Sequence, residues 1–174
     1  MDRYFNVTGA CNAKYHYMVD LQPRLEKIKV LVDRGNYFTI NRARQYGKTT
    51  TLSAMKQYLK NDYLVVSLDF QMMSHGDFES EAAFVAALAR EICIATAPDN
   101  IMPDLIRKQL EAFGQGKVAG ARLALLFSVL STWCAEADKP IVLMIDEVDS
   151  ATNNQVFLDF LSQLRGYYIR REEG

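Results

Sequence analysis

Hydrophobic positions near the start of the chain follow the spacing of an amphipathic helix and then that of a strand. Apolar residues recur every three or four positions between Asp20, a candidate N-cap, and Gly35, a candidate stop, which predicts a helix there. Aromatic and β-branched residues at 37–40 predict a short strand. A polar loop follows the strand, and a second helix is expected to begin near Lys48, with Leu52, Met55 and Leu59 on its buried side.

Two longer apolar runs, at 63–70 and 141–145, predict further strands. Three helical patterns lie between them, over 85–92, 106–113 and 123–133, with a glycine-rich break at 114–116. A last helix is predicted from the apolar positions between 157 and 168. Strands that alternate with helices, two of them wholly apolar, indicate an α/β fold whose parallel sheet is covered on both faces.

Composition indicates one globular domain over residues 1–174, with 1–36 as an N-terminal extension and helix and 37–174 as the core. Hydrophobic residues make up 49% of the chain, and 20 Lys and Arg balance 21 Asp and Glu. This balance argues against a dedicated nucleic-acid binder. We find neither an apolar run of membrane-spanning length nor metal-ligand spacing among the three cysteines. These features predict a cytoplasmic protein without a membrane partner.

The segment Gly47-Lys48-Thr49-Thr50 lies where a strand is expected to pass into a helix. Phosphates are bound by converging backbone N–H groups and by the positive end of a helix dipole. Gly47 permits close approach of the backbone, Lys48 supplies a cation for the β- and γ-phosphates, and Thr49 supplies a hydroxyl for Mg²⁺. Thr50 is expected near the α-phosphate. The same residues can also be an exposed lysine and a capping threonine at an ordinary helix start, and the strand–loop–helix context favours phosphate binding.

One position departs from the full pattern Gly-x-x-x-x-Gly-Lys-[Ser/Thr]. Its first glycine is replaced by Arg42, so an L-residue must form the opening turn of the loop. Arg42 and Arg44 either reinforce the binding of a triphosphate or face a surface or partner.

Asp146 and Glu147 follow directly after the apolar run 141–145, about 100 residues beyond Gly47. In an open parallel sheet, ligands bind at the carboxyl ends of the strands. Asp146 is therefore placed to hold Mg²⁺ opposite Thr49, and Glu147 to orient and deprotonate an attacking water. Acidic residues can also mark the point where a strand meets solvent. Two weak motifs in this order indicate one site.

The segments 42–50 and 141–150 resemble the Walker A and Walker B motifs of P-loop ATPases. Together with 5–9, 16–20 and the loop from Ile40, they resemble the bacterial AAA-like ATP-binding proteins. The resemblance implies a three-layer P-loop NTPase sheet, mainly parallel and flanked by helices, with ATP and Mg²⁺ as cofactors. It implies nucleotide binding by Arg44, Gln45, Tyr46, Gly47, Lys48, Thr49 and Thr50, a metal held by Thr49 and Asp146, and catalysis by Lys48 and Glu147.

The resemblance also implies the strand order 5-1-4-3-2, in which the strand after Walker B lies between the two Walker strands. No apolar run after the last predicted helix supplies that strand. We therefore expect either the N-terminal part of an ATPase whose C-terminal domain or partner protein lies outside this sequence, or a truncated gene product. Direct pairing of the two Walker strands, as in the kinase–GTPase division, is the alternative.

The leading functional prediction is ATP binding and Mg²⁺-dependent hydrolysis that drives or switches a partner domain or another protomer of a homo-oligomer. Arg42 and the missing strand favour an alternative, a nucleotide sensor that does not hydrolyse ATP. A third hypothesis is an ATPase that acts on nucleic acid, although the net charge of −1 does not support it. The segment His16-Tyr17 is a candidate adenine contact or a packing segment, and Asp69 is expected to cap the turn after its strand.

Overall fold

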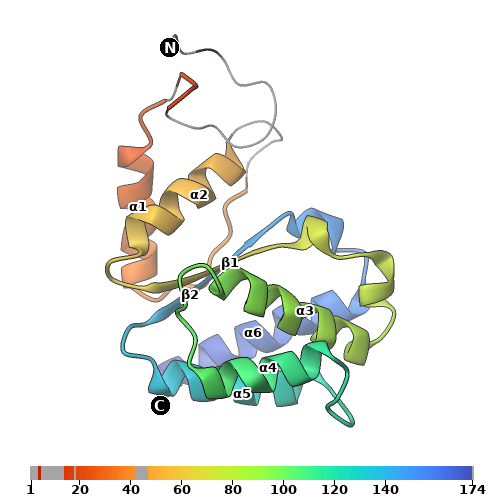
Figure 1. The fold of residues 1–174 in the computed structure, drawn as a ribbon. Helices are drawn as coiled ribbons and strands as arrows, with labels where there is room; N and C mark the ends of the chain where they lie inside the picture. The colour runs from red at the N-terminus through yellow and green to blue at the C-terminus, as the bar shows by residue number, and fades with distance from the viewer. Residues whose placement is uncertain (1–3, 5–13, 18, 42–46, 174) are drawn as a thin grey trace. The chain divides into compact units, whose positions relative to one another are not determined.

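The computed structural model describes residues 4, 14–17, 19–41 and 47–173. Within these residues the chain forms six α-helices and two β-strands, joined by loops and short 3₁₀ turns (Figure 1). The chain divides into two compact units, Met1–Val65 and Val66–Gly174.

The first unit contains two helices that pack against each other, α1 (Gln22–Asp33) and α2 (Lys48–Leu59). Both confirm the predicted helices. The carboxylate of Asp20 accepts the backbone N–H of Gln22 at 2.9 Å and so stabilises the turn that leads into α1. In α2, Met55 and Leu59 are buried as expected, whereas Leu52 is half-buried.

An exposed polar cluster connects the last turn of α1 to the segment after α2. The Lys29 ammonium lies 2.8 Å from Asp33 and 3.4 Å from Asp62, and the Tyr63 hydroxyl donates to Asp33 at 2.7 Å. Hydrogen bonds from Lys29 and Tyr63 hold the pKa of the Asp33 carboxyl below its usual range. The same carboxylate raises the pKa of Tyr63, because it favours the protonated hydroxyl.

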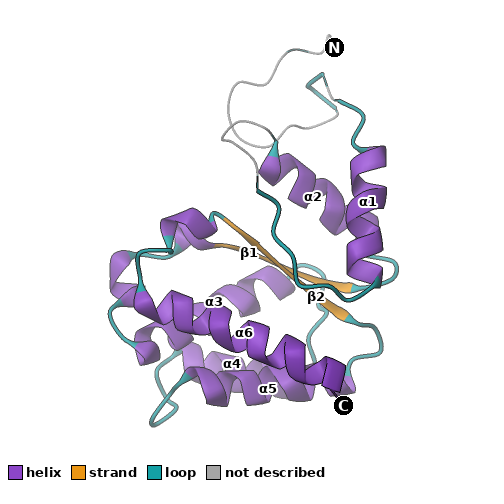
Figure 2. Ribbon diagram, turned by 180° about the vertical axis from the view of Figure 1, so that it is seen from behind, coloured by secondary structure: helices purple, strands orange, loops and turns teal. Residues whose placement is uncertain are grey.

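The two strands, β1 (Leu64–Asp69) and β2 (Ile141–Asp146), pair as a parallel two-stranded sheet (Figure 2). They confirm the strands predicted at 63–70 and 141–145. Parallel strands cannot be joined by a tight turn and need a long crossover connection. Here the connection between β1 and β2 contains three α-helices.

The predicted strand at 37–40 is absent from the part of the chain that the structure describes. Residues 37–40 alternate between exposed and half-buried positions, but they belong to no ladder. β-branched and aromatic residues favour an extended chain, whereas a strand also needs a partner for its backbone hydrogen bonds. Tyr37, at the start of this segment, is 44% exposed.

The expectation that both apolar strands are buried on both faces is wrong for β2. Met144 is buried, but Leu143 is 37% exposed. In both views the helices of the second unit lie on the same side of the strand pair (Figures 1 and 2). One face of β2 therefore has no helix of its own unit against it, and the three-layer arrangement stays a prediction.

The second unit contains four α-helices, and α4 packs against both α3 and α5: α3 (Glu81–Thr96), α4 (Asp104–Gly114), α5 (Leu123–Glu136) and α6 (Gln155–Glu173). Their predicted apolar positions form the core, with fully buried Val85, Leu88, Ile106, Leu110, Leu123, Leu126 and Phe157. Aromatic rings connect the end of β1 to α6, since the Phe70 centroid lies 5.2 Å from that of Phe157. The core therefore anchors the carboxyl end of the sheet.

Candidate nucleotide-binding site

The first turn of α2 contains the described part of the predicted phosphate-binding segment. Gly47 has a left-handed backbone (φ 70°), which favours glycine, and α2 begins at the next residue, Lys48. Thr49 and Thr50 complete the first turn, which contains no acidic residue. The first N–H groups of an α-helix point out of its N-terminal end, so this turn presents a positive dipole end together with a lysine. Such an arrangement suits an anion.

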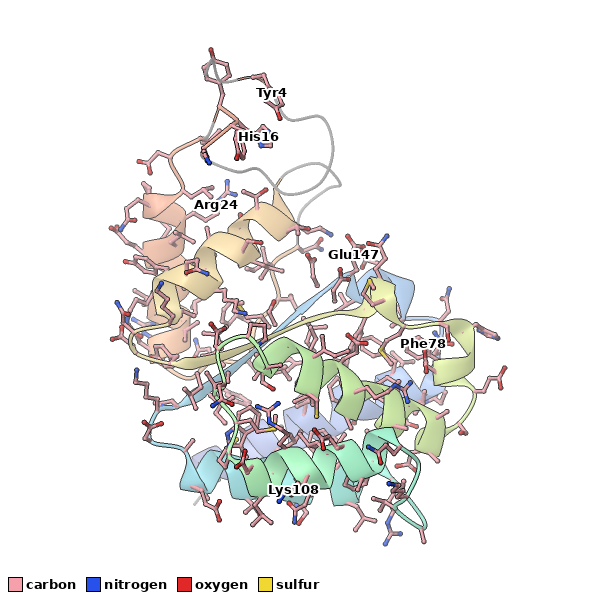
Figure 3. The ribbon with its side chains drawn as sticks, viewed as in Figure 1. Tyr4, His16, Arg24, Phe78, Lys108 and Glu147 are labelled. Atoms are coloured by element: carbon pink, nitrogen blue, oxygen red, sulfur yellow. The ribbon has the colours of Figure 1, made fainter. Side chains whose placement is uncertain are left out.

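Two residues that sequence reasoning missed support this turn. The hydroxyl of Thr51, which is 2% exposed, donates to the Gly47 carbonyl at 2.8 Å. The guanidinium of Arg24 donates in turn to the Thr51 hydroxyl at 3.1 Å, reaching across from α1 (Figure 3). Thr51 could have been found as a hydroxyl four residues after Gly47, since threonine often bonds the carbonyl one turn back. No sequence pattern indicates the contact between Arg24 and Thr51.

The remaining nucleotide-binding predictions, Arg44, Gln45 and Tyr46, lie outside the described residues, as does Arg42. Their roles stay predictions.

The acidic pair predicted for metal binding and catalysis lies at the end of β2. Asp146 is the last residue of the strand, and its carboxylate accepts the backbone N–H of Glu147 at 3.0 Å. Glu147 has a left-handed backbone, with φ 54° and ψ 35°. Such a conformation in a residue other than glycine costs about 1–2 kcal/mol. It turns the chain sharply into the 3₁₀ turn η3 (Val148–Ser150), and both acidic side chains are half-buried.

The carboxyl ends of the two strands lie together. β2 contacts the 3₁₀ turn η1 (Phe70–Met72), which follows β1, and η1 contacts η3. Asp69, the last residue of β1, is therefore at the same end of the sheet as Asp146 and Glu147. Its carboxylate accepts the N–H of Gln71 at 2.9 Å, which agrees with the predicted capping role. Acidic side chains thus collect where an open parallel sheet binds its ligands.

Among the described residues, no three or more His, Cys, Asp or Glu side chains are grouped as a metal site. This does not conflict with the predicted donors. Mg²⁺ is usually bound through one or two carboxylates, water and substrate phosphates rather than by a cage of protein ligands. Thr49 and Asp146 carry the hard oxygen atoms that this ion prefers.

His16, a predicted adenine contact, lies against Tyr4 near the N-terminus. Tyr4 and His16 form an isolated backbone bridge, and their rings meet edge to face with centroids 4.8 Å apart. His16 therefore packs against an aromatic neighbour, whether or not a purine binds beside it.

A cavity of about 730 Å³ opens in the second unit between the starts of α3 and α6. None of the predicted site residues lines it. Three carboxylates, those of Glu79, Glu81 and Asp159, face it together with amide and hydroxyl groups. A polyanionic nucleotide would be repelled by this lining, so the cavity is a poor candidate for the phosphate site.

Comparison with protein families shows the family of the chain. The model of the AAA-like domain matches residues 13–173, which is nearly the whole chain, and the protein therefore belongs to the AAA-like domain family. Membership indicates a nucleotide-binding function of the ATPase type. Comparisons with curated proteins and with solved structures found no match. Among the described residues, every helix is too short or too polar to cross a membrane.

Proposed function

We propose that this chain binds ATP with Mg²⁺ and hydrolyses it, and that hydrolysis drives or switches a partner domain, a partner protein or a neighbouring protomer. The observation that carries the proposal is the left-handed Gly47 at the start of α2, followed at once by Lys48 and Thr49, in a chain of the AAA-like family. This geometry supports a turn that receives phosphates, because it joins backbone donors, a cation and a hydroxyl.

Each proposed residue has a distinct role. Lys48 neutralises the β- and γ-phosphates, while Thr49 and Asp146 supply oxygen ligands to Mg²⁺. Glu147 accepts a proton from the attacking water, and its place directly after Asp146 at the carboxyl end of β2 supports this role. Gly47, Thr50 and residues 44–46 contact the phosphates.

Thermal melting with and without Mg-ATP tests binding. Ligand at about 100 times its dissociation constant adds roughly 2.7 kcal/mol of stability, and we expect this gain to vanish in Lys48→Ala. Lys60→Ala is the matched control, because it removes an exposed lysine from the opposite end of α2. An unchanged gain in Lys48→Ala would contradict the proposed site.

Phosphate release tests hydrolysis. Glu147→Gln removes the base but keeps the size of the side chain, so this variant should still bind ATP while losing turnover. A non-hydrolysing sensor is the second candidate, and it is favoured by Arg42 at the first glycine position of the loop. For a sensor, wild type and Glu147→Gln would bind ATP equally and neither would release phosphate.

A further inference from the structure

Arg24 connects helix α1 to the first turn of α2 through one buried hydroxyl. Its Nη1 atom lies 3.1 Å from Oγ1 of Thr51, a residue 27 positions later in the chain. The Thr51 hydroxyl accepts this hydrogen bond and donates its own proton to the Gly47 carbonyl at 2.8 Å. The three residues therefore form a continuous hydrogen-bonded chain within the first unit.

The final acceptor of this chain belongs to the peptide that joins Gly47 to Lys48. The Gly47 carbonyl also accepts the backbone N–H of Thr51 at 2.9 Å, so two donors fix its direction along α2. In a planar trans peptide the N–H of the next residue points the opposite way. The hydroxyl of Thr51 therefore helps to fix the direction of the Lys48 N–H, which points out of the N-terminal end of the helix.

The charge of Arg24 is unusual for this location. Cations are unfavourable near the positive end of a helix dipole. Here a guanidinium contacts the first turn of α2, Lys48 begins that turn, and the turn contains no acidic residue. A bound anion would offset this repulsion, and a more highly charged anion would offset more of it.

We propose that Arg24 is a positioning residue for the phosphate-binding turn. Through Thr51 it holds the Gly47–Lys48 peptide in the orientation that receives a phosphate, and its charge favours nucleoside triphosphates over monophosphates. This inference rests on the function proposed above.

Titration calorimetry with Mg-ATP and with AMP tests the proposal on wild type, Arg24→Gln, Thr51→Val and Thr51→Ser. We expect Arg24→Gln and Thr51→Val to weaken Mg-ATP binding about five- to tenfold, the effect of losing one hydrogen bond of moderate strength. Thr51→Ser keeps the hydroxyl and should bind within about twofold of wild type. Arg24→Gln should weaken AMP binding less than Mg-ATP binding.

Lys29→Gln is the matched control, since it also removes one positive charge and one tertiary contact from α1, in the exposed cluster with Asp33 and Asp62. It should lower the melting temperature without changing the dissociation constant for Mg-ATP. The double variant Arg24→Gln/Thr51→Val should bind no more weakly than the worse single variant, because both changes interrupt one chain of contacts.

The outcomes separate the two proposals. If wild type does not bind Mg-ATP, the proposed function and this inference both fail. If Arg24→Gln folds and binds like wild type, or only melts earlier as Lys29→Gln does, the inference fails while the proposed function stands. Should Arg24→Gln not fold, the Thr51 variants decide, and equal binding by Thr51→Val and Thr51→Ser overturns the inference.

Discussion

Asp146 holds the backbone of its neighbour Glu147, whose N–H donates to the Asp146 carboxylate at 3.0 Å. This contact stabilises a turn in which Glu147 has φ 54°, a value that side-chain-bearing residues seldom adopt. The proposed metal ligand thus also fixes the main chain of the proposed base.

The left-handed backbone at Glu147 predicts an unusual order of stability among its variants. Glu147→Gly should be more stable than Glu147→Ala by about 1 kcal/mol, because only glycine adopts this conformation without steric cost. In a helix or strand the order would be reversed. Urea denaturation of both variants measures the difference. An alanine variant as stable as the glycine variant would show that the backbone at this position is unstrained.

The Asp33 cluster predicts a loss of stability in acid. The pKa of Asp33 is lower in the folded chain than in the unfolded one, so the folded state releases this proton more readily. The stabilisation that Asp33 gives to the folded state is complete above its pKa in the unfolded chain. It disappears as the pH falls through its pKa in the folded chain. The difference in melting temperature between wild type and Asp33→Asn should therefore shrink as the pH is lowered from 6 to about 3. Asp138→Asn, an exposed substitution in the other unit, should show no comparable change.

The aromatic core predicts a large effect of truncating Phe160, which is 1% exposed. Its ring lies within 5.6–6.3 Å, centroid to centroid, of the rings of Phe70, Phe84, Phe127 and Phe157. Phe160→Ala should lower the free energy of unfolding by about 3–5 kcal/mol, because it leaves a cavity among these rings. Tyr167→Ala, at a 40% exposed position on the same helix, should cost much less. Equal losses would argue against a core centred on Phe160.

Glu81 caps the start of α5, although the two are far apart in the sequence, and we expect its removal to destabilise the chain. Its carboxylate accepts the backbone N–H of Leu123, the first residue of α5, at 2.8 Å. Arg122 occupies the N-cap of α5 and forms no side-chain cap. Glu81→Ala should therefore destabilise the chain by about 1 kcal/mol in urea denaturation. The neighbouring exposed substitution Glu79→Ala should stay within about 0.5 kcal/mol of wild type.

The helices and paired strands could be predicted from sequence where the apolar pattern itself determines the structure. Val85, Leu88 and Ile92 recur at helical spacing and are all buried in α3. The prediction of a strand at 37–40 was wrong, because the backbone pairing that makes a strand depends on residues elsewhere in the chain.

For the candidate site, the sequence predicted which elements hold Lys48 and Asp146, but not the contacts that support them. Lys48 and Asp146 stand at a helix start and a strand end, as expected. Glutamate at position 147 gives no local signal of a left-handed backbone, and the contact of Arg24 with Thr51 joins residues 27 positions apart in the chain. Both supports became visible only in three dimensions.

The aromatic contact between Phe70 and Phe157 limits how the acidic end of the sheet can move. Phe70 follows Asp69 directly, and Phe157 lies in the first turn of α6, shortly after Glu147 and η3. Separating these buried rings would expose apolar surface at a cost of about 1.5–3 kcal/mol for each side chain. A rearrangement at Glu147 that keeps the rings together must instead carry α6 with η1. Because η1 and the first turn of α6 then move together, this aromatic contact couples the chain segments on either side of the acidic pair.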